Sequence, residues 1–175
     1  MSRFHAKTRG RLAGVVVSIA MFLSFAAAHP EQVAKDPIQW AVRAIMPEKP
    51  LQPGDTFKVE LLASIEAGWH LYSTDQTEGG PIPTRISLPP DQPFKLAGAI
   101  ESSEPKTAMD PNFNLMTEYY EEQAAFWIPV KVAADAAAGK SQFRVQVSYQ
   151  TCNDQLCLPP KTVKLALEVT LGSDK

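Results

Sequence analysis

Two cysteines carry the most distinctive chemistry of this sequence. Cys152 and Cys157 are the chain's only cysteines, and four residues lie between them. Two thiols can form a disulfide and be reduced again in exchange with the thiols of another protein. Asn153 and Asp154 favour a turn, and a turn there can bring the two Cα atoms within the roughly 4.4–6.8 Å that a disulfide requires. With two cysteines, a single intramolecular pairing is possible.

The residues alone leave two uses of such a disulfide open. A structural bridge is the common use in exported domains, but a bridge across so short a loop removes little entropy from the unfolded chain. Reversible exchange is the other use. No Lys, Arg or His lies within three residues of either cysteine, and Asp154 stands between them. We therefore expect thiols that do not ionise readily, which suits a relay between partner proteins.

The segments around the cysteines have the alternation of β-strands. Residues 142–150 alternate apolar and polar side chains just before Cys152, and residues 163–169 do so again after the bend. Shorter apolar segments separated by Pro and Gly recur from residue 38 on. This pattern predicts an all-β sandwich of about eight strands. Residues 101–120 lack clear alternation, and we expect them to form an excursion from the sandwich.

The N-terminus has the three parts of a secretory signal peptide. Four basic residues are followed by an apolar run over residues 12–25 and by three alanines that end at Ala28. An uncleaved membrane anchor is the alternative, but the run is shorter than the ~20 residues that a spanning helix needs. We predict a signal peptide over residues 1–28, cleaved after Ala28, a flexible lead-in over 29–36 and one domain over 37–175. This organisation predicts a periplasmic or secreted protein that is not inserted in the membrane.

The charge of the remaining chain excludes two classes of partner. Removal of the four basic residues of the signal leaves 13 Lys and Arg against 19 Asp and Glu, a net charge of −6. Nucleic-acid binding needs a concentrated basic surface, and anionic lipid attracts polybasic segments. We therefore expect neither as a partner.

Other residues that could carry chemistry lack companions. His29 and His70 have no further ligands at the spacing of a metal site. Met46, Met109 and Met116 could bind a soft metal ion, but they are scattered along the sequence, and packing or loop positions explain them better. We expect no metal and no cofactor.

Several short runs resemble the N-terminal periplasmic domain of the thiol:disulfide interchange protein DsbD. They are Tyr149-Gln150 before Cys152, Leu158-Pro159-Pro160 after Cys157, Gly68-Trp69-His70-Leu71-Tyr72 and Ile128-Pro129-Val130. The resemblance extends from about Pro37 to Leu171. It implies an immunoglobulin-like sandwich with the cysteine pair on a hairpin at one end. It also implies electron transfer from a membrane-fed donor to periplasmic thioredoxin-like proteins.

The resemblance also assigns roles to individual residues. Cys157 would form the mixed disulfide with a partner, and Cys152 would resolve it. Phe113 matches the aromatic residue of a cap loop that shields the cysteines, because it lies five residues before Glu118-Tyr119. Tyr72 and Tyr149 could form aromatic walls around the pair, although core packing explains either residue almost as well.

This sequence departs from the family pattern in three ways. Members of the family often have one more residue between their cysteines. The acidic residues that precede the cap Phe are replaced by Pro111-Asn112, so Asp110 is the nearest carboxylate. The chain also ends after one domain, which predicts a separate membrane protein as electron donor. We therefore expect a component of a thiol–disulfide oxidoreductase system, with a secreted, non-enzymatic β-sandwich that binds other proteins and holds a structural disulfide as the alternative.

Overall fold

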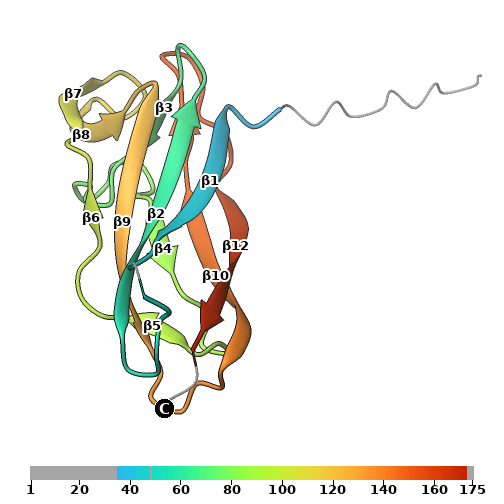
Figure 1. The fold of residues 1–175 in the computed structure, drawn as a ribbon. Helices are drawn as coiled ribbons and strands as arrows, with labels where there is room; N and C mark the ends of the chain where they lie inside the picture. Colours follow the sequence, from blue (N-terminus) through green and yellow to red (C-terminus); the bar gives the residue numbers. More distant parts are fainter. Residues whose placement is uncertain (1–34, 48, 173–175) are drawn as a thin grey trace, which may run out of the picture. The chain divides into compact units, whose positions relative to one another are not determined.

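The structure is a computed structural model that describes residues 35–47 and 49–172. These residues form β-strands and turns and contain no helix (Figure 1). The strands in chain order are β1 (Ile38–Ile45), β2 (Thr56–Ile65), β3 (His70–Tyr72), β4 (Arg85–Ser87), β5 (Phe94–Leu96), β6 (Glu101–Ser102), β7 (Lys106–Asp110), β8 (Leu115–Tyr120), β9 (Gln123–Val132), β10 (Gly139–Tyr149), β11 (Thr151–Cys152) and β12 (Lys161–Leu171). Strands β3, β4, β5, β6 and β11 have only two or three residues, too few for an alternating pattern to define their ends.

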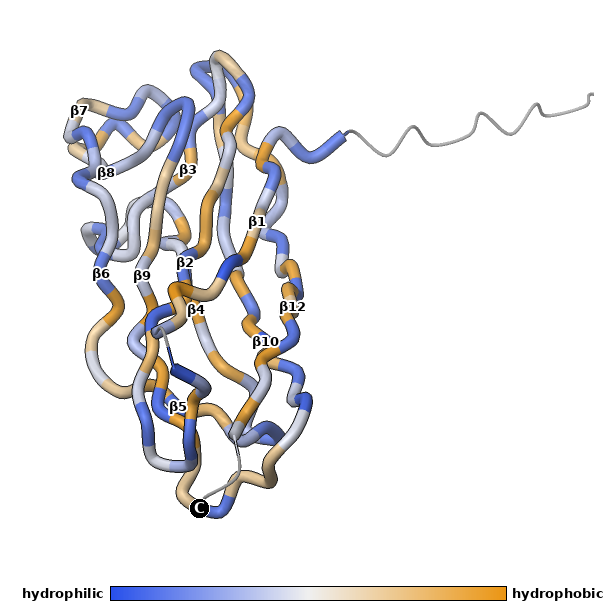
Figure 2. Tube along the Cα trace, in the orientation of Figure 1, coloured by the Kyte–Doolittle hydropathy of each residue, from blue (hydrophilic) through white to orange (hydrophobic). Residues whose placement is uncertain are grey.

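Two antiparallel sheets form the predicted sandwich. One sheet has the order β1-β2-β9-β5, with β6 also paired to β9, and the other has the order β12-β10-β4. The core between them is apolar, and apolar segments recur along the strands of both sheets in Figure 2. Three buried rings meet across this core, because Phe57 of β2, Phe94 of β5 and Phe143 of β10 have centroids 5.7–6.4 Å apart.

Strand β10 shows how the sequence pattern produces this arrangement. Phe143, Val145, Val147 and Tyr149 are buried, and the residues between them are more exposed. Successive side chains of a strand point to opposite faces, so the alternation seen in residues 142–150 directs one apolar face into the core. The prediction for this segment is confirmed. Strand β10 pairs along its whole length with β12.

A third sheet, separate from the sandwich, has the order β11-β3-β8-β7. It lies at the upper end of Figure 1, where the hairpin β7–β8 is labelled. This hairpin falls within residues 101–120, so the predicted excursion from the sandwich is confirmed for β7 and β8, whereas β6 pairs with β9 of the sandwich. The sheet joins β11, which ends at Cys152, to β3 and to the hairpin. It therefore positions the candidate site.

The predicted signal peptide and its cleavage after Ala28 lie outside the described residues. At the end of the predicted lead-in, Asp36 accepts hydrogen bonds from the amide of Ile38 (3.0 Å) and the hydroxyl of Tyr149 (2.5 Å). The Lys161 ammonium lies 2.7 Å from the same carboxylate. Burial opposes ionisation of Asp36, but the hydrogen bonds from Lys161 and Tyr149 outweigh it and hold the pKa of this carboxyl below its usual value.

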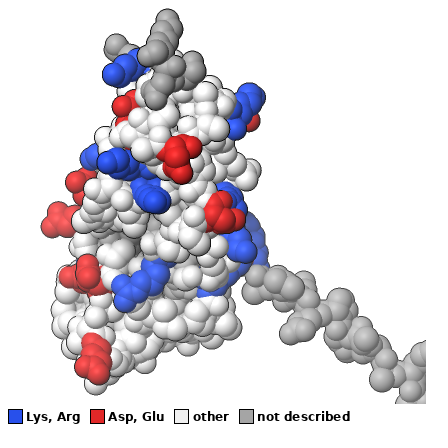
Figure 3. Space-filling view, turned by 90° about the horizontal axis from the view of Figure 1, so that it is seen from below, with Lys and Arg blue, Asp and Glu red and all other residues white. Residues whose placement is uncertain are grey.

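Two surface properties bear on possible partners. No helix among residues 35–47 and 49–172 is long and apolar enough to cross a membrane. On the face that Figure 3 shows, Lys and Arg side chains are interspersed with Asp and Glu. This face therefore lacks the concentrated basic patch that nucleic-acid binding needs.

Candidate functional site

The cysteine pair lies on a tight bend that follows β11. Cys152 and Cys157 form a disulfide, with Cα atoms 4.0 Å apart. The side chain of Asn153 accepts hydrogen bonds from the amides of Gln155 (2.9 Å) and Leu156 (2.8 Å). This use of an Asn side chain to hold the next amides is the turn chemistry predicted from the sequence. The bend therefore brings the two sulfurs together, as the residue types predict.

Pairing with β3 fixes the bend to the third sheet. Cys152 lies opposite His70, and Thr151 lies opposite Leu71. The Thr151 hydroxyl donates to the carbonyl of His70 (2.7 Å), and the amide of Leu158 donates to the carbonyl of Thr151 (3.0 Å). Thr151 is thereby attached to β3, and the far side of the bend is attached to Thr151.

The two cysteines differ in exposure. Cys152 has no exposed surface, whereas Cys157 is half-buried. Leu156, directly before Cys157, is 52% exposed. A partner that approaches this end of the domain therefore reaches Cys157 before Cys152.

The turn between β7 and β8 contacts the cysteine bend. Asp110 organises the turn, because its carboxylate accepts from the amide of Asn112 (2.8 Å) and its carbonyl accepts from the amide of Asn114 (2.8 Å). The Asn112 side chain donates to the carbonyl of Asn153 (2.9 Å). Phe113, in the same turn, packs edge-on against Tyr72 with ring centroids 6.0 Å apart. The structure thus brings Phe113 to the site, where its role as a shield stays a prediction.

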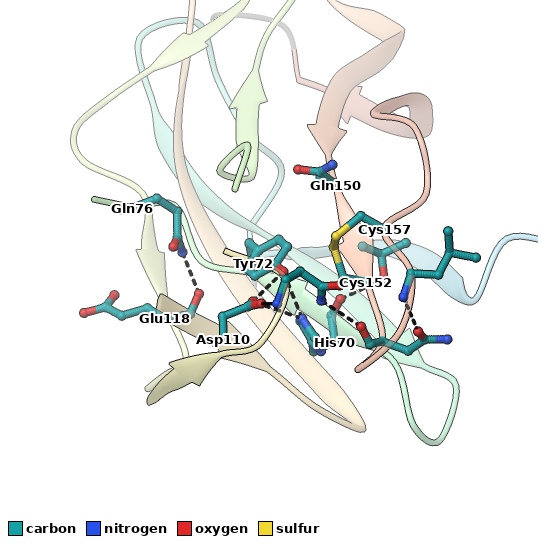
Figure 4. Close-up of polar contacts among 12 residues, drawn as sticks. His70, Tyr72, Gln76, Asp110, Glu118, Gln150, Cys152 and Cys157 are labelled. Carbon is teal, nitrogen blue, oxygen red and sulfur yellow. Dashed lines mark hydrogen bonds and ion pairs between the residues drawn. A yellow bond between two sulfur atoms is a disulfide. The ribbon is translucent and has the colours of Figure 1, made fainter. Parts of the chain in front are cut away.

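A buried polar network lies under this turn (Figure 4). The Tyr72 hydroxyl donates to Oδ2 of Asp110 (2.6 Å), and Nε2 of His70 lies 3.0 Å from the same hydroxyl and 3.7 Å from that carboxylate oxygen. All three side chains are at least 90% buried. Such groups are stable in a low-dielectric interior only when their hydrogen bonds are satisfied.

Burial and hydrogen bonding change the ionisation of these groups in different directions. Burial lowers the pKa of His70, against the attraction of Asp110, Asp154 and Glu121 for its charged form. Burial opposes ionisation of Asp110, but the hydrogen bonds from Tyr72 and from the amide of Asn112 outweigh it and lower the pKa of this carboxyl. Burial makes the largest contribution to a raised pKa of Tyr72, and the hydrogen bond to the Asp110 carboxylate and its negative charge raise this pKa further. At neutral pH the network therefore contains a carboxylate, a phenol and a neutral imidazole.

Tyr149 has different surroundings from Tyr72. Its ring packs against Trp40 of β1 with centroids 5.4 Å apart, and its hydroxyl donates to Asp36. These contacts are the core packing that we considered as the alternative for this residue, and its proposed place in the wall around the cysteines stays a prediction. Gln150, the next residue, accepts from the amide of Ile82 (3.0 Å).

Sequence reasoning missed His70 and Asp110 as parts of the site. Each lies far from the cysteines in the chain, and no cysteine neighbour in sequence is basic. The pairing of β3 with β11 places His70 opposite Cys152, and the β7–β8 hairpin places Asp110 above Tyr72. The run Gly68-Trp69-His70-Leu71-Tyr72, which is part of the family resemblance, was the only signal available for His70.

Comparison with known proteins decides the family. Residues 41–169 match the family described as the N-terminal domain of thiol:disulfide interchange protein DsbD. The chain belongs to this family. It is therefore a thiol–disulfide interchange domain of the DsbD N-terminal type, with an immunoglobulin-like fold and one disulfide pair. A search among curated proteins finds no match.

Solved structures of two related domains are similar to this chain. The DsbD N-terminal domain of Neisseria meningitidis in its reduced form is 16% identical, with a TM-score of 0.46 over 69% of this chain and 82% of that one. The N-terminal periplasmic domain of ScsB from Proteus mirabilis is 17% identical, with a TM-score of 0.50 over 78% of this chain. The aligned part spans about half of that ScsB structure, 47% of its length. At this identity the likeness to ScsB shows a shared fold.

Proposed function

We propose that this protein is a periplasmic module that passes electrons between protein partners through a reversible Cys152–Cys157 disulfide. The observation that carries the proposal is the position of the disulfide. It lies on a bend at one end of the domain, outside the core of the sandwich, with one half-buried cysteine. Membership of the DsbD N-terminal family supports the same function. Exchange of this kind needs no dissociable cofactor, because the sulfurs themselves carry the electrons.

The difference in exposure supports an order for the two sulfurs. In the proposed cycle Cys157 forms the mixed disulfide with a partner, because it is the more exposed of the two cysteines. Cys152 then attacks Cys157, restores the internal disulfide and releases the partner. Cys152 is suited to this second step because it is buried beside Cys157, where an external thiol does not compete.

The proposed partners are thioredoxin-like periplasmic proteins and a membrane-embedded electron donor. The family supports both classes, and the predicted signal peptide supports a periplasmic location. The exposed Leu156, directly before Cys157, provides apolar contact area for such a partner. Phe113 is proposed to limit unwanted oxidation of the thiols when no partner is bound.

A trapping experiment tests the proposal. Cys152→Ala retains the attacking Cys157 but lacks the resolving sulfur, so mixed with periplasmic extract it should accumulate a mixed disulfide that reductant releases. Cys157→Ala is the matched control and should trap much less, because its remaining sulfur is buried. Mass spectrometry of the trapped species should identify a protein with a thioredoxin fold. If neither variant forms a mixed disulfide, the proposed exchange function is wrong.

The reduction potential separates this function from a structural disulfide. A structural bridge typically has a potential below about −300 mV and resists glutathione, whereas a relay equilibrates with thioredoxin-like proteins. We expect equilibration of the Cys152–Cys157 pair with a thioredoxin of known potential. Resistance to both reductants would favour the secreted binding module with a structural disulfide.

A further inference from the structure

His70 is the basic side chain that the fold places beside the cysteines. It is the strand partner of Cys152 in the antiparallel pair β3–β11. Directly opposite residues in such a pair project from the same face, with Cβ atoms about 4.5–5.5 Å apart. The side chains of His70 and Cys152 therefore leave the third sheet from adjacent positions on the same face.

The hydrogen bonds of the network determine which nitrogen of His70 carries the proton. Tyr72 has a single hydroxyl proton, which it donates to Asp110 (2.6 Å). Its oxygen must then accept the hydrogen bond from Nε2 of His70 (3.0 Å). A neutral imidazole with its proton on Nε2 has its lone pair on Nδ1. The network thus holds His70 in the tautomer whose Nδ1 can accept a proton.

We propose that His70 exchanges a proton with Cys152 during thiol–disulfide exchange, and that Tyr72 and Asp110 hold its imidazole for this purpose. The inference rests on the proposed function and adds an acid–base group to it. Neither cysteine has a basic residue near it in the sequence, and His70 is a base that the pairing of β3 with β11 brings opposite Cys152.

The balanced step starts from the mixed disulfide between Cys157 and a thioredoxin-like partner. The Cys152 thiol gives its proton to His70, and the thiolate attacks the sulfur of Cys157. The Cys152–Cys157 bond forms while the bond from Cys157 to the partner breaks, and the partner's sulfur leaves with the electron pair as a thiolate. That thiolate takes up a proton from the imidazolium or from water. The reverse sequence returns the proton to Cys152 when the internal disulfide is opened.

The charges around His70 favour transfer of a proton to it once a thiol is present. The groups that act on its ring come from five segments: Tyr72 of β3, Asp110 of β7, Tyr119 of β8, Asp154 of the cysteine bend and Glu121 after β8. Three of them are carboxylates, and none of them is a cation. Burial lowers the pKa of His70 in the disulfide form, and a Cys152 thiolate beside it would raise this pKa again.

A titration of Cys152 tests the inference without any partner. The full chain with Cys157→Ser has Cys152 as its single thiol, and ultraviolet absorbance reports its ionisation. We expect His70→Gln in this background to raise the midpoint by about one pH unit, because Gln can still donate to Tyr72 but cannot take up a proton. Asp110→Asn should raise the midpoint in the same direction. Glu101→Gln is the matched control and should change it little, because Glu101 is exposed on β6 and paired with Lys58.

A second measurement uses the unaltered chain and does not depend on the folding of a variant. The titration of the His70 ring, followed by NMR, should have a higher midpoint in the dithiol form than in the disulfide form. Equal midpoints in the two forms, or an unchanged Cys152 midpoint in a folded His70→Gln variant, would overturn the inference. If the wild-type pair still exchanges with a thioredoxin-like protein in that case, the proposed function stands. If the wild-type pair does not exchange, the proposed function fails irrespective of His70.

Discussion

Tyr72 links the two ionisable residues of the buried network. Its side chain has no exposed surface, and its hydroxyl contacts both Asp110 and His70. We expect Tyr72→Phe to lower the free energy of unfolding by about 1–3 kcal/mol, because a buried carboxylate loses a hydrogen-bond donor. Urea unfolding of the disulfide form measures this loss.

Tyr149→Phe is the matched control for this substitution. Tyr149 is also a buried tyrosine that donates to an aspartate, but its acceptor Asp36 retains the ammonium of Lys161 and the amide of Ile38. The loss should therefore be smaller than for Tyr72→Phe. Equal losses would mean that the Asp110 network has no special dependence on Tyr72.

The lowered pKa of His70 predicts a pH dependence of stability. The unfolded chain takes up a proton on His70 near the usual pKa of 6.5, whereas the folded disulfide form resists protonation because the ring is buried. The unfolded state then binds more protons, so the free energy of unfolding falls as the pH falls through this window. We expect the free energy of unfolding of His70→Gln to fall less between about pH 7 and pH 5 than that of the wild type, as measured by denaturant unfolding. A decrease of equal size in both proteins would contradict this assignment.

Asp110 acts in the same direction in a separate, more acidic window. Its pKa is lowered in the folded state, so its contribution is present above the usual carboxyl value of 3.8 and is lost as the pH falls below it. The two residues can therefore be distinguished by the pH at which stability is lost.

At the scale of elements, the turn between β7 and β8 makes two contacts with the surroundings of the disulfide. Phe113 packs on Tyr72, and Asn112 bonds to the cysteine bend. We expect Phe113→Ala to speed alkylation of the reduced thiols by roughly fivefold, since an aromatic pair contributes on the order of 1 kcal/mol to closure. Alkylation by a bulky maleimide, followed by mass spectrometry, measures the rate.

Met116→Ala provides the control for this prediction. Met116 lies on the same hairpin and is 51% exposed. It is three residues before Tyr119 in β8, so its side chain points to the opposite face of the strand. Its removal should leave the alkylation rate unchanged. If Phe113→Ala is alkylated at the wild-type rate, Phe113 does not shield the thiols.

At the scale of the whole domain, the disulfide lies outside the apolar core that stabilises the fold. The core lies between the two large sheets, where Phe57, Phe94 and Phe143 meet, and the cysteine bend belongs to the third sheet. A loop of this length should contribute no more than about 2 kcal/mol through unfolded-chain entropy. We therefore expect the reduced protein to remain folded.

Denaturant unfolding with and without reductant checks this expectation. A variant with both cysteines replaced by alanine should match the reduced wild type, because both lack the cross-link. Loss of the folded state on reduction alone would show that the disulfide is structural, and the redox function would then be untenable.

Local patterns in the sequence determined much of this fold. The alternation in residues 142–150 and 163–169 predicts β10 and β12, because side chains of a strand alternate between its faces. The spacing of Cys152 and Cys157 around turn-forming residues predicts the disulfide. Such features depend on neighbours in the chain, so they can be read without knowledge of the tertiary structure.

Tertiary structure alone decided the composition of the site. The register of β3 against β11 places His70 opposite Cys152, and the hairpin β7–β8 brings Asp110 and Asn112 over them. These residues are distant in sequence, and a shift of one residue in the register would turn His70 to the other face of the sheet. The pairing of short strands follows from the packing of the whole domain, because segments of two or three residues carry too little pattern of their own to specify their partners.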